Sequence, residues 1–167
     1  MKTIAVVVLD DIRSAHNVGS AFRTSDAAGV SRLILCGTTP TPLDRFGRPR
    51  ADLAKVALGA ERTLAWEYSK TTAAALAALK REDCFIIAVE QSPRAVDYKK
   101  IKMPKGARGR SAKVAFVFGN EVSGISPKLL ARRGLIDAVA DIPMRGGKES
   151  LNVSVAIGIA LFRMLGV

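Results

Sequence analysis

The feature that most constrains the fold is a regular alternation of short apolar runs with helical segments. The first run, residues 4–9, is apolar throughout and rich in β-branched side chains, as expected of a strand covered on both faces. Asn17 can cap a helix that runs to about Ala28 and is closed by Gly29, and residues 32–36 predict the next strand. This order of strand, helix and strand is a βαβ unit, which places its two strands parallel.

The same alternation continues to the end of the chain. It predicts a helix over residues 71–81, strands over residues 84–90, 114–118 and 138–142, a short helix from Ser126-Pro127 to Gly134, and a buried helix within residues 151–167. Strands that alternate with helices imply an α/β fold with a mostly parallel sheet and helices on both faces. No repeat or domain boundary interrupts the pattern, so we expect one domain over residues 1–167, with loops at residues 37–50 and 91–113.

The charge balance is strongly basic. Lys plus Arg number 26 against 15 Asp plus Glu, which gives a formal net charge of +11 and favours a polyanionic partner over a charge kept for solubility alone. Aromatic residues, the usual stacking platforms for single-stranded nucleic acids, make up only 5%. One run of cations without an acid follows Asp97, at Lys99, Lys100, Lys102, Lys105, Arg108, Arg110 and Lys113. It is either a solvated segment or an arm that docks on phosphates.

Several classes of chemistry are disfavoured. His16 is the only histidine, and Cys36 and Cys84 lie far apart in apolar runs, so we expect no metal site, no histidine-based triad and no disulfide. Residues 145–149, RGGKE, lack the first glycine and the final Ser/Thr of a Walker loop, and no GxGxxG follows the first strand. The apolar start is too short for a signal peptide or a membrane span, which predicts a cytoplasmic protein without a membrane partner.

Polar groups gather where predicted strands run through turns toward helices, which is where open α/β sheets bind ligands. Residues 17–23 could be no more than a capped helix in which Arg23 bridges Asp26. Residues 117–126 deliver Glu121 just past the end of a strand, between two glycines that let a ligand or another backbone come close. A tight strand-to-helix turn is the alternative explanation for that segment.

A third polar segment, residues 142–154, leads into the last helix. Because that helix is apolar on nearly every side, we expect it to be buried, so polar side chains in its first turn must find partners or bind something. Ser150 can be an ordinary N-cap, whereas Asn152 is harder to explain by folding alone.

These three segments resemble the motifs of the SpoU (TrmH-like) branch of the SPOUT RNA methyltransferases. The phrases are NxGxxxR at residues 17–23, FGNE at residues 118–121, and IPM with SLNVS within residues 142–154, in matching order and spacing. The resemblance implies an α/β SPOUT fold with a deep C-terminal trefoil knot, an exception to the rule that chains do not knot. It also implies an enzyme that methylates a ribose 2′-hydroxyl of tRNA or rRNA with S-adenosylmethionine and no metal.

The resemblance also implies roles for individual residues. The cofactor would be received at Gly119, Ile142, Met144 and Leu151. The catalytic group would comprise Arg23, Asn17, Glu121, Ser150 and Asn152. Because a guanidinium hardly ever deprotonates, we expect Arg23 to hold a phosphate and stabilise the developing alkoxide. Glu121 would be the proton acceptor or an orienting partner, and the remaining three would position the groups around it.

The family acts as homodimers whose sites are completed across the interface, so we expect a homodimer that binds RNA. Since the first strand begins at residue 4, we expect no separate N-terminal RNA-binding domain, and we hypothesise that the cations of residues 99–113 replace it. Two alternatives stay open at this point. One is a non-catalytic RNA-binding protein on the same fold, and the other is a SPOUT enzyme that methylates a base nitrogen.

Overall fold

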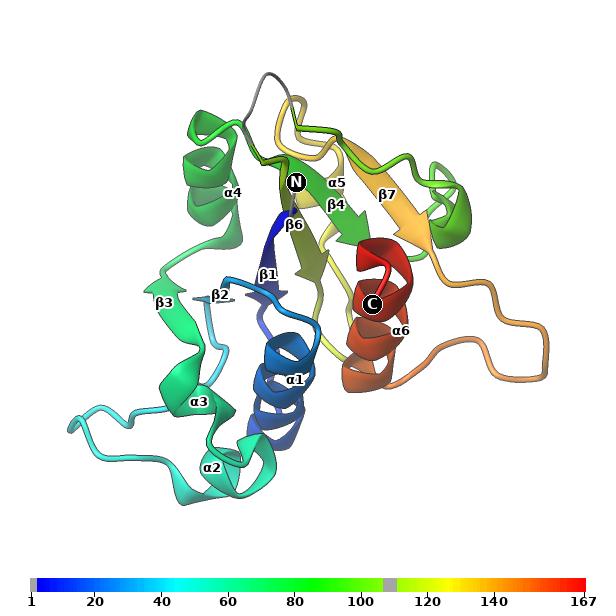
Figure 1. The fold of residues 1–167 in the computed structure, drawn as a ribbon. Coiled ribbons are helices and arrows are strands. Elements are labelled where there is room, and N and C mark those ends of the chain that lie inside the picture. The colour runs from blue at the N-terminus through cyan, green and yellow to red at the C-terminus, as the bar shows by residue number, and fades with distance from the viewer. Residues whose placement is uncertain (1–2, 107–110) are drawn as a thin grey trace.

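The computed structural model describes residues 3–106 and 111–167, which form a seven-stranded sheet of order β3-β2-β1-β6-β4-β7-β5 (Figure 1). The strands are β1 Ile4–Asp10, β2 Arg32–Cys36, β3 Ala65–Ser69, β4 Phe85–Val89, β5 Val96–Asp97, β6 Lys113–Phe118 and β7 Ala138–Asp141. The helices are α1 Ala15–Ala27, α2 Ala51–Ala57, α3 Ala60–Thr63, α4 Thr72–Arg81, the 3₁₀ helix η1 Tyr98–Lys100, α5 Pro127–Leu130 and α6 Val153–Leu165. Every pair of neighbouring strands is parallel, which confirms the predicted parallel sheet.

Helices cover both faces of the sheet, also as predicted. On one face Val7 packs in a core with Phe22 of α1 and with side chains of α2 and α6. On the other face Val8 packs in a second core with Leu76 of α4 and with side chains of α5. Successive residues of β1 point to opposite faces, so the strand needs apolar side chains on both sides, which explains its uninterrupted apolar run.

The start of α1 differs from the prediction. Ser14, not Asn17, is its N-cap, and the Ser14 hydroxyl oxygen accepts the N–H of Asn17 at 3.2 Å. Serine caps helices as well as asparagine does, and here the serine stands three residues earlier. Asn17 is therefore a buried residue of the first turn, while the predicted close of the helix at Gly29, with φ +72°, is confirmed.

Other elements were not predicted or were predicted too long. The sequence patterns missed α2, α3 and β3, because these are short helices and a largely exposed strand at the edge of the sheet that lacks an apolar run. Helix α5 ends at Leu130 rather than at Gly134. The predicted loop at residues 91–113 contains β5 and η1, and Lys113 already belongs to β6.

The last helix, α6, is buried on one side only, which corrects the prediction of a buried helix that is apolar on nearly every side. It packs Ile157 and Leu161 into the core and lies beside α1 (Figure 1). Its other side exposes 47% of Val155 and 39% of Phe162. Within the described ranges neither α6 nor any other helix is long and apolar enough to cross a membrane.

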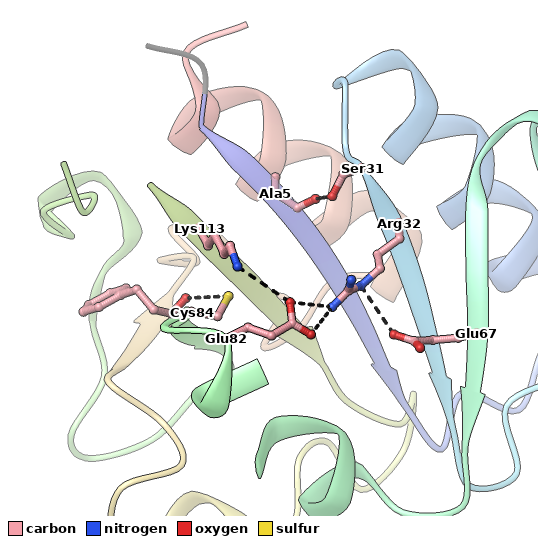
Figure 2. A network of polar contacts seen from close by, with 8 residues as sticks. Ala5, Ser31, Arg32, Glu67, Glu82, Cys84 and Lys113 are labelled. Atoms are coloured by element: carbon pink, nitrogen blue, oxygen red, sulfur yellow. Dashed lines mark hydrogen bonds and ion pairs between the residues drawn. The ribbon is translucent and has the colours of Figure 1, made fainter. Parts of the chain in front are cut away.

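Paired charges occupy the amino end of the sheet (Figure 2). Nη2 of Arg32 lies 2.9 Å from the Glu82 carboxylate and its Nε lies 3.3 Å from that of Glu67, while Nζ of Lys113 lies 4.0 Å from Glu82. These ion pairs tie β2 to β3 and to the turn that follows α4. The polar groups that the sequence singles out lie at the opposite, carboxyl end of the sheet.

Candidate active site

A cleft of about 470 Å³ opens where β4, β6 and β7 end. Its walls are the loops that follow these strands and the start of α6, because parallel strands bring their carboxyl ends to one edge of the sheet. The predicted cofactor residues Gly119, Ile142, Met144 and Leu151 all line it, as do Glu121, Ser150 and Asn152. The volume lies within the range of small-molecule sites, about 300–1,000 Å³.

A chain of hydrogen bonds joins three of the predicted catalytic residues. The side-chain amide of Asn17 donates to Oε1 of Glu121 at 2.9 Å, and the side-chain amide of Asn152 donates to Oδ1 of Asn17 at 3.2 Å. Asn17 is only 7% exposed. The three residues come from α1, from the turn after β6 and from the start of α6, so this contact connects all three sequence motifs.

The carboxylate of Glu121 is held by hydrogen bonds at the amino end of α1. It accepts the backbone N–H groups of Arg13 at 3.0 Å and Ser14 at 3.2 Å, besides the amide of Asn17. Partial burial raises the pKa of Glu121, but these hydrogen bonds outweigh it and lower the pKa below its ordinary value. A carboxylate that stays ionised and already accepts these bonds is a poor base, so the geometry favours an orienting role.

Gly119 and Gly124 allow a tight turn between β6 and α5. A Cβ added to Gly119 would overlap the backbone of Gly124 and Ile125, and one added to Gly124, which has φ +63°, would overlap the Glu90 carboxylate. The side-chain oxygen of Asn120 closes the turn by accepting the two backbone N–H groups that follow Glu121. The tight-turn explanation therefore holds, and the same turn forms one wall of the cleft.

The start of α6 also differs in detail from the prediction. Asn152 is the N-cap, and its side-chain oxygen accepts the N–H of Ser154 at 2.8 Å. Ser150 is exposed at the cleft and forms no hydrogen bond with any residue that the structure describes. Asn152 thus performs two tasks, since it caps α6 and donates to Asn17.

Arg23 does not join the other predicted catalytic residues. It is exposed on α1, does not line the cleft, and has no ion pair with Asp26 or with any other residue in the described part of the chain. Relative to Asn17 it lies about 9 Å farther along the helix and about 120° around the axis. A single chain therefore does not deliver this side chain to its own cleft.

Sequence reasoning missed part of the site. The cleft is also lined by Val89, Glu90 and Gln91 at the end of β4, and by Asp141 at the end of β7. Glu90 and Gln91, at the end of a predicted strand, could have indicated that this strand contributes to the cleft. The sequence, however, does not show that β4 lies between β6 and β7. Within residues 3–106 and 111–167, no three His, Cys, Asp or Glu side chains form a group that could hold a metal ion.

The basic segment that follows Asp97 begins beside the cleft. Asp97 of β5 pairs with Asp141 of β7, and Tyr98, Ile101 and Met103 then pack against the core. The exposed cations of this stretch, up to residue 106, are Lys99, Lys100, Lys102 and Lys105. Arg108 and Arg110, which we also predicted to bind RNA, lie outside the described residues.

The sequence and the fold together assign the chain to a family. The sequence matches the SpoU rRNA Methylase family over residues 4–162, and the chain belongs to this family. RlmB of Neisseria meningitidis, a 23S rRNA (guanosine-2′-O-)-methyltransferase, is 34% identical over 156 residues, which are 93% of this chain and 56% of the relative. RlmB of Escherichia coli is 32% identical over 157 residues, which are 94% of this chain and 58% of the relative. The chain thus spans little more than half the length of these curated relatives.

Solved structures agree with this assignment. An AdoMet-bound rRNA methyltransferase from Sinorhizobium meliloti superposes with a TM-score of 0.79 at 30% identity, over 98% of this chain and 56% of that one. A protein solved in work on the 2-OH methylation of C/U34 on tRNA superposes with a TM-score of 0.73 at 26% identity, over 99% of both chains. The resemblance and the α/β fold class are confirmed, while the trefoil knot stays a prediction.

Proposed function

We propose that this chain transfers the methyl group of S-adenosylmethionine to a ribose 2′-hydroxyl of tRNA or rRNA in the cytoplasm. The observation that carries the proposal is that two structural features meet at the carboxyl ends of the strands. These are the cleft lined by Gly119, Ile142 and Leu151 and the hydrogen-bonded chain from Glu121 through Asn17 to Asn152. The relatives named above act on ribosomal RNA, and one solved relative concerns tRNA.

The residues of the cleft fit this cofactor. The side chains of Ile142 and Leu151 offer apolar contacts for the adenosine part, and Gly119 lets a ligand approach the main chain. Asp141 lines the cleft, and its side chain has no hydrogen bond or ion pair with any described residue, so its carboxylate is free to face a cationic group. When bound, S-adenosylmethionine supplies an electrophilic methyl group on a sulfonium centre.

The protein positions the ribose and stabilises charge beside this cofactor. Asn17 is held from both sides, by Glu121 and by Asn152, so its amide has a fixed orientation next to the cleft. The guanidinium of Arg23 would hold the phosphate next to the target ribose and stabilise the negative charge that develops on the 2′-oxygen. The exposed position of Arg23 calls for a second subunit.

A homodimer supplies that arrangement. Helices α1 and α6 lie side by side, with the main chain of Gly158 close to Thr24, and this pair exposes Arg23 together with Val155 and Phe162. An exposed apolar helix face is suited to an isologous contact. In such a dimer each subunit would present Arg23 to the cleft of its partner.

The basic segment of residues 99–113 would dock the RNA. Its exposed lysines are free to meet phosphates, since Tyr98 and Ile101 anchor the segment on the core. Replacing Lys99, Lys100, Lys102 and Lys105 by Glu should weaken RNA binding and flatten its salt dependence, with unchanged affinity for the cofactor. Loss of both affinities would contradict this role.

The test of the proposed function uses S-adenosylmethionine with a labelled methyl group and bulk RNA, followed by alkaline digestion. A 2′-O-methyl group blocks cleavage of the following phosphodiester, so the proposal expects the label in alkali-resistant dinucleotides. Label in mononucleotides would indicate methylation of a base. RNA binding without any incorporated label would indicate a non-catalytic binding protein.

A further inference from the structure

The loop between β2 and α2 contains an ordered hairpin, which we call the 42–50 hairpin. Its two arms pair through an isolated bridge between Leu43 and Pro49. The N–H of Asp44 donates to the carbonyl of Arg48 at 2.8 Å, and the N–H of Arg50 donates to the carbonyl of Pro42 at 2.9 Å. The segment is predicted to be a plain loop, and none of its side chains belongs to the cleft described above.

A single carboxylate fixes the tip of the 42–50 hairpin. Asp44 accepts the backbone N–H groups of Phe46 at 2.8 Å and Arg48 at 3.0 Å. It also pairs with the guanidinium of Arg48 at 3.0 Å. A tip held by these bonds is already ordered before it meets a partner, so binding costs little conformational entropy there.

The tip presents an aromatic ring beside two cations. Phe46 is 65% exposed and is the most exposed phenylalanine of the described residues. The guanidinium carbons of Arg45 and Arg48 lie 4.7 and 4.9 Å from the centroid of its ring. Burial in the core explains the phenylalanines of β6 and α1, but it does not explain a ring that faces solvent at the end of a projecting hairpin.

The charge at the tip indicates an anionic partner. Arg45 has no ion pair with any described residue, and Asp44 is the only carboxylate that pairs with a cation at the tip. An aromatic ring beside guanidinium groups is the combination with which proteins bind single-stranded nucleic acids, because a base stacks on the ring and a phosphate meets a cation. An apolar protein surface would leave Arg45 without a partner.

The 42–50 hairpin also follows the carboxyl end of a strand, as the loops of the cleft do. It follows the carboxyl end of β2, and the cleft lies at the carboxyl ends of β6 and its neighbours. Strands β2 and β6 flank β1, so their ends are about 10 Å apart. Figure 1 shows this segment, in cyan, projecting away from the body of the molecule near α2 and α3. The hairpin and the cleft therefore both follow carboxyl ends of strands of the same sheet, so an RNA of sufficient length can contact both.

We propose that the 42–50 hairpin binds an unpaired nucleotide of the RNA substrate, with the base stacked on Phe46 and a neighbouring phosphate held by Arg45. The inference rests on the proposed function, because it takes the substrate to be RNA. It adds a contact outside the cofactor cleft and outside the basic segment of residues 99–113.

The test compares Phe46→Ala, Phe46→Trp and, as a matched control on the same hairpin, Leu43→Ala, which removes another exposed apolar side chain. The probe is a labelled single-stranded RNA of about 12 nucleotides, within the usual site sizes of single-strand binders, and the same RNA annealed to its complement. Phe46→Ala should weaken single-strand binding about 5- to 100-fold, the usual effect of removing one stacking platform. Phe46→Trp and Leu43→Ala should bind like the unchanged protein, and duplex affinity should change far less.

Several outcomes would overturn the proposal. These are an unchanged single-strand affinity of Phe46→Ala, an equal loss for the duplex, or an equal loss in Leu43→Ala. A shift of Phe46→Ala to a smaller species in sedimentation would make the tip a protein contact instead. A melting temperature and a cofactor affinity equal to those of the unchanged protein show that the variant is folded. The assay reads binding alone, so a failure of the methylation experiment is distinguishable from a failure here.

Discussion

At the scale of single residues, Glu121 shows how one side chain can serve both the fold and the site. Its two oxygens accept hydrogen bonds from Arg13, Ser14 and Asn17, and all three donors lie at the beginning of α1. Negative charge is also favourable at the amino end of a helix. The residue that the sequence marks as a candidate base is therefore the group that joins the turn after β6 to α1.

Glu121→Gln should lower the free energy of unfolding by about 1 kcal/mol at pH 7, because a glutamine has one acceptor oxygen and its NH₂ group would face N–H donors. The hydrogen bonds lower the pKa of Glu121 in the folded protein, so their stabilisation is complete above the ordinary glutamate pKa, about 4.3, and is lost as the pH falls through the lowered value. Urea unfolding of both proteins between pH 7 and pH 3 measures this difference. A difference that grows on acidification would contradict the role assigned to the carboxylate.

The close packing around Gly119 predicts that a larger residue there would impair both stability and cofactor binding. Gly119→Ala forces a Cβ into the backbone of Gly124 and Ile125, which should cost about 1–3 kcal/mol of stability and displace the cleft wall, with at least a tenfold loss of cofactor affinity. Gly146→Ala is the matched control, since a Cβ there meets nothing within 4 Å. Thermal unfolding and titration calorimetry test both variants, and equal behaviour of the two would refute the assigned packing.

At the scale of helices and strands, the sequence predicts most of what positions the site. Continuous apolar runs identify the central strands, and parallel strands must end at one edge, so the convergence of residues 117–126 and 142–154 follows from the pattern. The order of the strands depends on long-range packing, which no local pattern encodes, and so the contribution of β4 to the cleft was missed. The position of Asn17 inside α1 was missed because Ser14 competes for the cap.

Charged side chains have different roles at the amino ends and at the carboxyl ends of the strands. Arg32 of β2 pairs with Glu67 and Glu82 at the amino ends of the strands (Figure 2), whereas the cleft lies at their carboxyl ends. Arg32→Ala should therefore lower the free energy of unfolding by about 1 kcal/mol, the usual size for partly exposed ion pairs, and leave cofactor affinity unchanged. Denaturant unfolding and calorimetry on the same variant separate the two effects. A loss of cofactor affinity with full stability would contradict this division of roles.

At the scale of the whole molecule, the position of Arg23 predicts that activity needs two subunits. Arg23→Ala should be inactive, and so should Leu151→Glu, which places a charge in the cleft. A mixture of the two in equal amounts should recover about one quarter of the unchanged activity, because half of the dimers are mixed and each mixed dimer has one intact site. Methylation assays on the mixture, after subunit exchange, measure the recovery. A mixture as inactive as its components would show that Arg23 acts within its own chain.

The central claim is that the cleft at the ends of β4, β6 and β7 binds S-adenosylmethionine. Titration calorimetry with this cofactor tests it most directly, on the unchanged protein, on Leu151→Glu and on Arg32→Ala. We expect one cofactor per chain for the unchanged protein and for Arg32→Ala, and no binding for Leu151→Glu. Absence of binding in the unchanged protein, or binding that Leu151→Glu leaves intact, would contradict the account.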